Sequence, residues 1–122
     1  MRYESTGSSI TVFPVSEDGF EVGLVVHGSE YLVSFDAWHV ELASEAEALN
    51  LFALGLSDHC RLKEYRRGAF AYKWTMEYLA DGEWTEDETT GLLVFPFWRK
   101  ATMRYLQNRI LNFSRVDESA GA

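Results

Sequence analysis

Residues 69–80, with the sequence AFAYKWTMEYLA, constrain the fold most strongly, because large side chains alternate with small or polar ones along the whole segment. In an extended chain, successive side chains point to opposite faces. The large residues therefore share one face, and this ladder consists of Phe70, Tyr72, Trp74, Met76 and Tyr78. A period of two over this length predicts a long antiparallel strand with one buried face.

Turn sequences divide much of the remaining chain into further strands. Gly28-Ser29, Arg67-Gly68 and Asp81-Gly82 each supply the residue types of tight hairpin turns. Pro14 marks the end or edge of an earlier strand. The predicted strands lie at residues 10–15, 20–27, 30–38, 59–68, 69–80 and 83–95.

A first helix is predicted over residues 44–55. Ser44 and Glu47 form a capping box, and Gly55 fits the left-handed position that follows a helix. Beyond Glu47 the segment has no charge, and Asn50 is its one polar residue. A helix this apolar should be buried on more than one side.

A second helix is predicted over residues 97–113. Pro96 suits the first turn of a helix, where its missing amide costs nothing. Beyond it, one face at helical spacing carries Thr102, Met103, Leu106, Ile110 and Phe113. On this interpretation Phe97, Trp98 and Tyr105 lie beside this stripe and belong to the core. The alternative is that this stretch forms an aromatic binding site with a basic rim.

The elements therefore follow the order βββ-α-ββ(β)-α, which predicts one α+β domain over residues 1–122. We expect a two-layer sandwich in which helices cover one face of an antiparallel meander sheet. The ends, residues 1–9 and 114–122, should be frayed.

Composition limits the functional classes. The 122 residues suffice for one domain with its own core, and the single Cys60 excludes an internal disulfide. No apolar run approaches the length of a membrane span, and no secretory signal precedes the first strand. Residues 1–60 hold one basic and ten acidic residues, a net charge of −9, which disfavours nucleic acid and anionic membranes. We expect a cytoplasmic location.

No catalytic or cofactor motif is present, and we expect no cofactor. Imidazole, carboxylate and thiol groups suitable for zinc occur in the sequence, but nothing brings them together, and no metal site is predicted. We interpret them as surface or half-buried histidines and a buried thiol. The residues concerned are His27, Asp36, His39, His59 and Cys60.

Two surfaces remain as candidates for binding. Arg61, Lys63, Tyr65 and Arg67 share one face of a predicted strand, and we expect their charges to be matched by the acidic first half of the chain. The ladder over residues 70–78 is either core or a partly exposed groove, and its tyrosines and tryptophan suit contact with a partner.

Two functions follow. The first is a non-enzymatic adaptor, chaperone or immunity-type module that binds a protein partner or a second copy of itself as a homodimer. The alternative is a small-molecule-binding or hydrolytic site over the aromatic strand, with Asp36 or His39 as acid or base. The candidate binding residues for these functions are Tyr72, Trp74, Tyr78, Asp36, His39 and Trp98.

Overall fold

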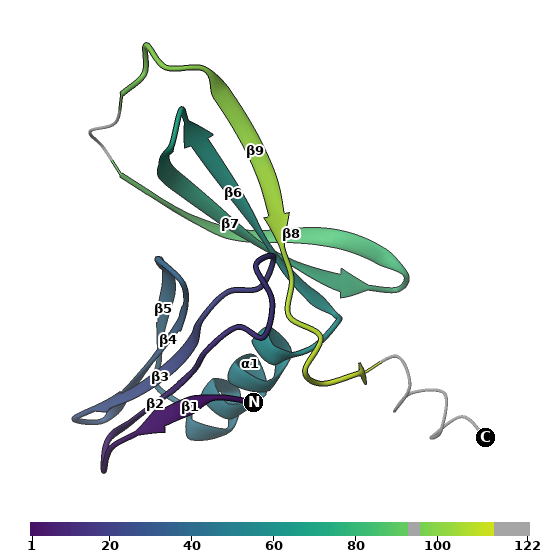
Figure 1. The fold of residues 1–122 in the computed structure, drawn as a ribbon. Helices are drawn as coiled ribbons and strands as arrows, with labels where there is room; N and C mark the ends of the chain where they lie inside the picture. The colour runs from purple at the N-terminus through teal and green to yellow at the C-terminus, as the bar shows by residue number, and fades with distance from the viewer. Residues whose placement is uncertain (93–95, 114–122) are drawn as a thin grey trace.

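The computed structural model describes residues 1–92 and 96–113, which form nine strands and one α-helix (Figure 1). The first five strands are β1 (Tyr3–Ser5), β2 (Ser9–Val12), β3 (Val22–His27), β4 (Glu30–Phe35) and β5 (Trp38–Leu42). The helix α1 (Glu45–Leu56) follows. The remaining strands are β6 (Cys60–Arg67), β7 (Phe70–Ala80), β8 (Glu83–Gly91) and β9 (Ala101–Leu106).

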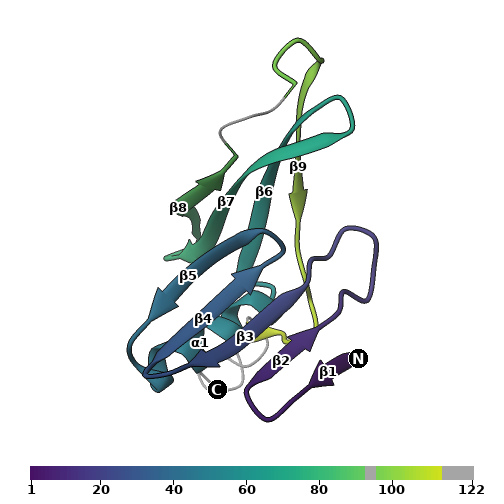
Figure 2. The same ribbon diagram turned by 90° about the vertical axis from the view of Figure 1, so that its left-hand side faces the viewer.

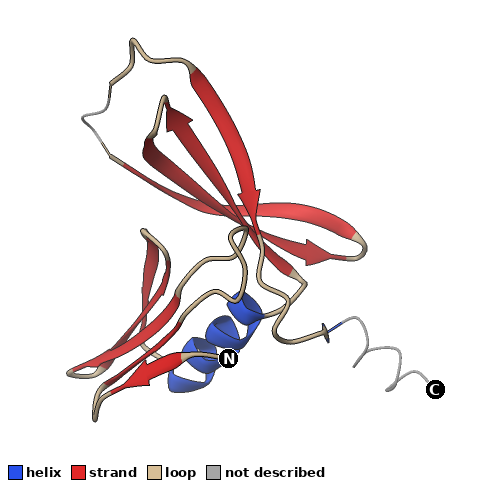
Figure 3. Cartoon of the chain, in the orientation of Figure 1, coloured by secondary structure: helices blue, strands red, loops and turns tan. Residues whose placement is uncertain are grey.

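The strands form two antiparallel sheets. The first is a meander in the order β1-β2-β3-β4-β5, and the second has the order β8-β7-β6-β9. Helix α1 lies behind the first sheet, and one end of the second sheet joins the same core (Figures 2 and 3). The far end of the second sheet extends beyond the first sheet (Figure 1). The broad prediction of antiparallel sheet with helix is confirmed, but the described residues contain one helix where two were predicted.

The first sheet has two strands that the sequence analysis did not predict. Tyr3–Ser5 pairs with β2, within the segment expected to be frayed. Trp38–Leu42 pairs with β4 after a two-residue turn at Asp36-Ala37, in which Asp36 has a φ of 51°. The turn was missed because it lacks the glycine typical of such hairpins. Residues 93–95 and 114–122, predicted as strand end and frayed tail, lie outside the described residues.

The predicted first helix is confirmed, but the role of Gly55 is not the one expected. The Ser44 hydroxyl accepts a hydrogen bond from the Glu47 amide at 3.3 Å, as in a helix cap. The helix continues through Gly55 to Leu56 and ends at the extended Ser57. A Cβ on Gly55 would lie 2.3 Å from the Phe35 ring. Glycine is therefore required because the Phe35 ring packs directly against the helix backbone.

We predict that Gly55→Ala destabilises the protein by about 2 kcal/mol, because overpacking a core contact typically costs about 1–3 kcal/mol. Alanine ordinarily favours a helix over glycine, so the sign of the change isolates the contact with Phe35. Urea unfolding measures the difference. Gly7→Ala is the control, since nothing lies within 4 Å of the added Cβ. Equal stabilities of the two variants would contradict the prediction.

The predicted second helix is wrong. Residues 101–106 form β9, which pairs antiparallel with β6 from Leu62↔Leu106 to Arg67↔Ala101. Phe97 and Trp98 are 70% and 72% exposed, so they are not core side chains. Residues 97–113 therefore do not lay a helical stripe on the ladder, and the sheet–helix contact predicted there is absent.

The sequence of β9 fits both periods, and long-range pairing decides between them. Over six residues, alternation places Ala101, Met103 and Tyr105 on one face. Pairing with β6 places Leu106 in the core and brings Arg104 to 2.8 Å from the buried Glu64 carboxylate. A helix at 97–113 would leave that carboxylate without its closest cation, which is costly in a buried position.

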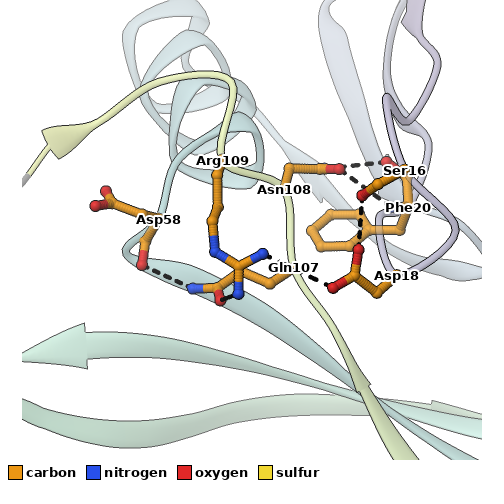
Figure 4. A network of polar contacts seen from close by, with 7 residues as sticks. All are labelled: Ser16, Asp18, Phe20, Asp58, Gln107, Asn108 and Arg109. Atoms are coloured by element: carbon orange, nitrogen blue, oxygen red, sulfur yellow. Dashed lines mark hydrogen bonds and ion pairs between the residues drawn. The ribbon is translucent and has the colours of Figure 1, made fainter.

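After β9 the chain crosses the junction of the two sheets, where Asn108 is 2% exposed (Figure 4). Its side-chain oxygen accepts from the Phe20 amide at 3.2 Å. Its amide nitrogen donates to the carbonyls of Phe20 and Gly55, both at 3.0 Å. Gln107 adds a bond from its side chain to the Asp58 carbonyl at 2.9 Å. One buried amide thus joins the β2–β3 connection, the end of α1 and the segment after β9.

We predict that Asn108→Ala lowers the free energy of unfolding by about 3 kcal/mol, because it leaves three buried backbone groups without partners. Denaturant unfolding measures the loss, with the exposed Asn50→Ala on α1 as the matched control. A change below about 1 kcal/mol would show that the Asn108 side chain does not hold these three segments together.

Candidate functional site

The second sheet has one face that is built from charged and aromatic side chains and is not covered by α1. Cross-strand register aligns Arg61 with Glu77, Lys63 with Tyr105, and Tyr65 with both Lys73 and Met103. We call this surface the outer face, and it consists of Arg61, Lys63, Tyr65, Lys73, Glu77, Trp84, Glu86, Met103 and Tyr105.

Arg61 is held in place at the end of this face that lies nearest the core. Its guanidinium carbon lies 4.3 Å from the Trp84 ring centroid and 4.0 Å from that of Tyr105. Its Nε donates to Glu77 Oε1 at 2.7 Å, and the Glu77 side chain is 5% exposed. A guanidinium between two rings with a buried carboxylate beneath it is fixed in orientation.

A second stack lies farther along the sheet. The ammonium nitrogens of Lys73 and Lys63 lie 4.1 Å and 5.2 Å from the centroid of the Tyr65 ring. Lys63 Nζ also lies 3.7 Å from Glu86. A hydrogen bond with Tyr65 is the largest cause that raises the pKa of Lys63 above its usual value. Lys63 therefore stays charged on this face at neutral pH.

The row of basic residues predicted on β6 is present, but the carboxylates that pair with it differ from those expected. Arg61 and Lys63 pair with Glu77 of β7 and Glu86 of β8, not with acids of the first half. The row was assigned to distant acids because the sequence did not show that β7 and β8 place carboxylates directly across from it. The acidic charge of residues 1–60 is therefore left uncompensated by these two cations.

The ladder on β7 is largely core at its centre. Trp74 is 7% exposed and Met76 is 1% exposed, and Tyr78 packs against the same cluster. Phe70 is 43% exposed at the far end of the sheet. The pairing shifts between Tyr65, which lies opposite Lys73, and Arg66, which lies opposite Ala71, and this shift interrupts the alternation. The structure favours the core interpretation for the middle of the ladder over a groove.

The other candidate residues do not gather around that strand. His39 is exposed, and its Nδ1 lies 3.1 Å from the Ala37 carbonyl. The Asp36 carboxylate accepts from the Glu21 amide at 2.9 Å. Desolvation by the surrounding chain raises the pKa of the Asp36 carboxyl, although the residue as a whole is exposed. Both side chains are thus engaged with nearby backbone, while Trp74 is buried.

Trp98 lies at the far end of the second sheet, where a shallow hollow of about 320 Å³ opens. The hollow lies between the β6–β7 turn and the segment before β9, and its lining residues are Arg67, Ala69, Phe70, Pro96, Trp98 and Arg99. We call residues 66–73 and 96–102 the tip of the second sheet. The tip contains five basic residues and no acidic one. Exposed aromatic side chains and basic residues thus lie together at this end, which is the composition that the alternative of an aromatic binding site with a basic rim requires.

The possible metal ligands stay apart. No group of three or more His, Cys, Asp or Glu side chains in residues 1–92 and 96–113 is arranged to hold a metal ion. Cys60 is fully buried, and desolvation raises the pKa of its thiol to about 12. Because the thiolate is the nucleophile, Cys60 is inert in the folded protein.

We predict that iodoacetamide labels Cys60 about a hundredfold more slowly in the native protein than in guanidinium chloride, because labelling must wait for unfolding. Intact-mass spectrometry over a time course measures the two rates. Comparable rates in both conditions would contradict the buried, protonated state of the thiol.

Sequence reasoning missed three aromatic or apolar members of the outer face: Trp84, Met103 and Tyr105. Met103 and Tyr105 were assigned to a helix, and Trp84 was included in the predicted strand at residues 83–95 without being named as a candidate. The alternation of Ala101, Met103 and Tyr105 was the signal that could have found two of them.

Comparison with protein-family models, curated proteins and solved structures found no match to this chain. No helix in the described part of the chain is long and apolar enough to cross a membrane.

Proposed function

We propose that this protein is a non-enzymatic binding module that recognises a protein partner through the outer face of its second sheet. One observation carries the proposal: two cation–π stacks hold Arg61 and Tyr65 in fixed positions on a sheet face that α1 does not cover. Adaptor, chaperone and immunity-type proteins are the classes that work by such binding alone.

The residue types of the outer face support a protein partner. Tryptophan, tyrosine and arginine are the residues that most often carry the binding energy of protein interfaces. Met103 and Tyr105 are 43% and 41% exposed, so apolar surface is present among the charges. Because Arg61 is already clamped between two rings, less side-chain entropy is lost on binding.

The charge pattern supports a protein over a nucleic acid. Arg61 and Lys63 are each within 4 Å of a carboxylate on the same face. Nucleic-acid affinity depends on cations that are available to phosphates. Acidic and basic groups interspersed on one face instead favour a partner of complementary mixed charge. A cytoplasmic location is part of the proposal, supported by the single cysteine, Cys60, which is free and buried.

The double variant Tyr65→Ala/Lys73→Glu tests the proposal. It removes one stack and reverses a charge without touching the Arg61–Glu77 pair, so the fold should be retained. We expect capture of the partner from cell extract to weaken at least about tenfold, a change of about 1.4 kcal/mol. Quantitative mass spectrometry of proteins captured by the immobilised chain measures the loss.

His39→Ala is the control, because His39 is exposed on the first sheet and lies outside the outer face. A specific protein should be lost from the double variant and kept by the control. If both variants capture the same proteins as the wild type in equal amounts, the outer face is not the binding surface.

A further inference from the structure

β9 is an edge strand whose outward backbone groups are unpaired among the described residues. It pairs with β6 on one side, where the Gly68 amide donates to the Lys100 carbonyl at 2.9 Å. Alternate residues of an antiparallel strand direct their backbone groups to the same side. Lys100, Thr102, Arg104 and Leu106 therefore bond to β6. The amides and carbonyls of Ala101, Met103 and Tyr105 point away from the sheet.

The unpaired stretch of this edge is bordered at both ends by other segments of the chain. The Gln107 amide, which follows the same alternation, donates to the Asp18 carbonyl at 2.7 Å. The loop between β2 and β3 thus lies beside the lower end of β9 (Figure 2). At the other end, a turn is closed by the Arg99 amide and the Pro96 carbonyl at 3.0 Å. The unpaired edge runs from residue 101 to residue 105.

The opposite edge of the sheet is protected, whereas β9 is not. β8 carries Glu83, Glu86, Asp87 and Glu88, and the Trp38 indole donates to the Glu88 carbonyl at 2.9 Å. In β9 the one charged residue is Arg104, which is paired with Glu64. Charges and coverage are the usual means by which proteins block an edge strand. An edge without them is suited to pairing with another strand.

We propose that β9 pairs antiparallel with β9 of a second copy of this chain, with Met103 opposite Met103 on a two-fold axis. This register places Ala101 opposite Tyr105 in both directions, so a small side chain meets a large one. The three residues of each copy whose backbone groups point away from β6 then form hydrogen-bonded pairs across the interface. Each pair exchanges two hydrogen bonds. The interface is self-complementary, as a two-fold contact requires.

Charge complementarity identifies a second copy as the occupant. β9 runs from the tip toward the end of the sheet that joins the core (Figure 1). Antiparallel pairing therefore lays the tip of each copy beside the first half of the other. The tip carries five basic residues and no acid, and residues 1–60 have a net charge of −9. In this register Lys100 of one copy lies opposite Leu106 of the other, one residue before Gln107, whose amide holds the Asp18 carbonyl. Lys100 therefore comes near Glu17 and Asp18 of the other copy.

The pairing has a consequence for binding. A two-fold axis perpendicular to a continuous sheet keeps equivalent faces on the same side. The outer faces of the two copies then form one surface, with Met103 and Tyr105 of each copy near its centre. The inference itself does not depend on the proposed function, because it needs only the edge of β9 and the charges at its ends.

The test is the mass of the full chain in solution, measured by sedimentation velocity over a range of concentrations. We expect a dimer for the wild type, with a dissociation constant that rises with salt. Met103→Pro removes the outward amide without removing a bond to β6, so it should raise the dissociation constant at least about tenfold. Met103→Ala, which keeps the amide, should still dimerise. A wild type that stays monomeric at all concentrations overturns the proposal and leaves the edge to a strand of another protein.

A charge exchange provides a second test should Met103→Pro fail to fold. Lys100→Glu should weaken the dimer about tenfold, and the double variant Lys100→Glu/Glu17→Lys should restore it. Both positions are exposed, so folding should be unaffected. A dimer that is insensitive to Lys100→Glu, or one that the double variant does not restore, overturns the antiparallel arrangement.

Discussion

The buried amide of Asn108 is the interaction on which the arrangement of the two sheets depends. Three of its hydrogen bonds go to backbone groups, two on Phe20 and one on Gly55. These groups lie at the entry to β3 and at the end of α1, so one side chain fixes where the chain passes after β9. Because buried polar groups must be paired, alternative paths for this segment would leave several backbone groups unsatisfied. The position of β9 along β6 follows from this anchor.

The requirement that buried polar groups be paired also makes the two faces of the second sheet different. Leu62, Met76 and Leu106 of the inner face join the core with α1 and the first sheet. The outer face keeps its charges in contact with one another, and Glu77 is buried beneath Arg61 and not exposed to water. An ion pair in such a position contributes little net stability, but breaking it is costly. The face is therefore rigid as well as exposed.

Local sequence signals predicted much of the fold. Gly28, Gly68 and Gly82 all have positive φ at the predicted hairpins, and Ser44 caps the predicted helix. Each of these features depends on residues close in sequence, so a short window contains the physical cause. Gly55 shows the limit: its role was assigned to a helix end, but a ring twenty residues earlier in the chain explains it. The ladder of β7 was likewise predicted as a strand, yet its bulge at Tyr72 follows from pairing with β6.

By itself the sequence determined the alternation of β7, the turns, the cap of α1 and the separation of acidic and basic charge along the chain. Tertiary structure alone decided that residues 101–106 form a strand, that Arg61 lies between Trp84 and Tyr105, and that the outer edge of β9 is unpaired by residues 1–92 and 96–113. The reason is the range of the interactions. A period of two and a helical period both fit six residues of β9, and the choice between them is made by hydrogen bonds and an ion pair to β6, some forty residues earlier in the sequence.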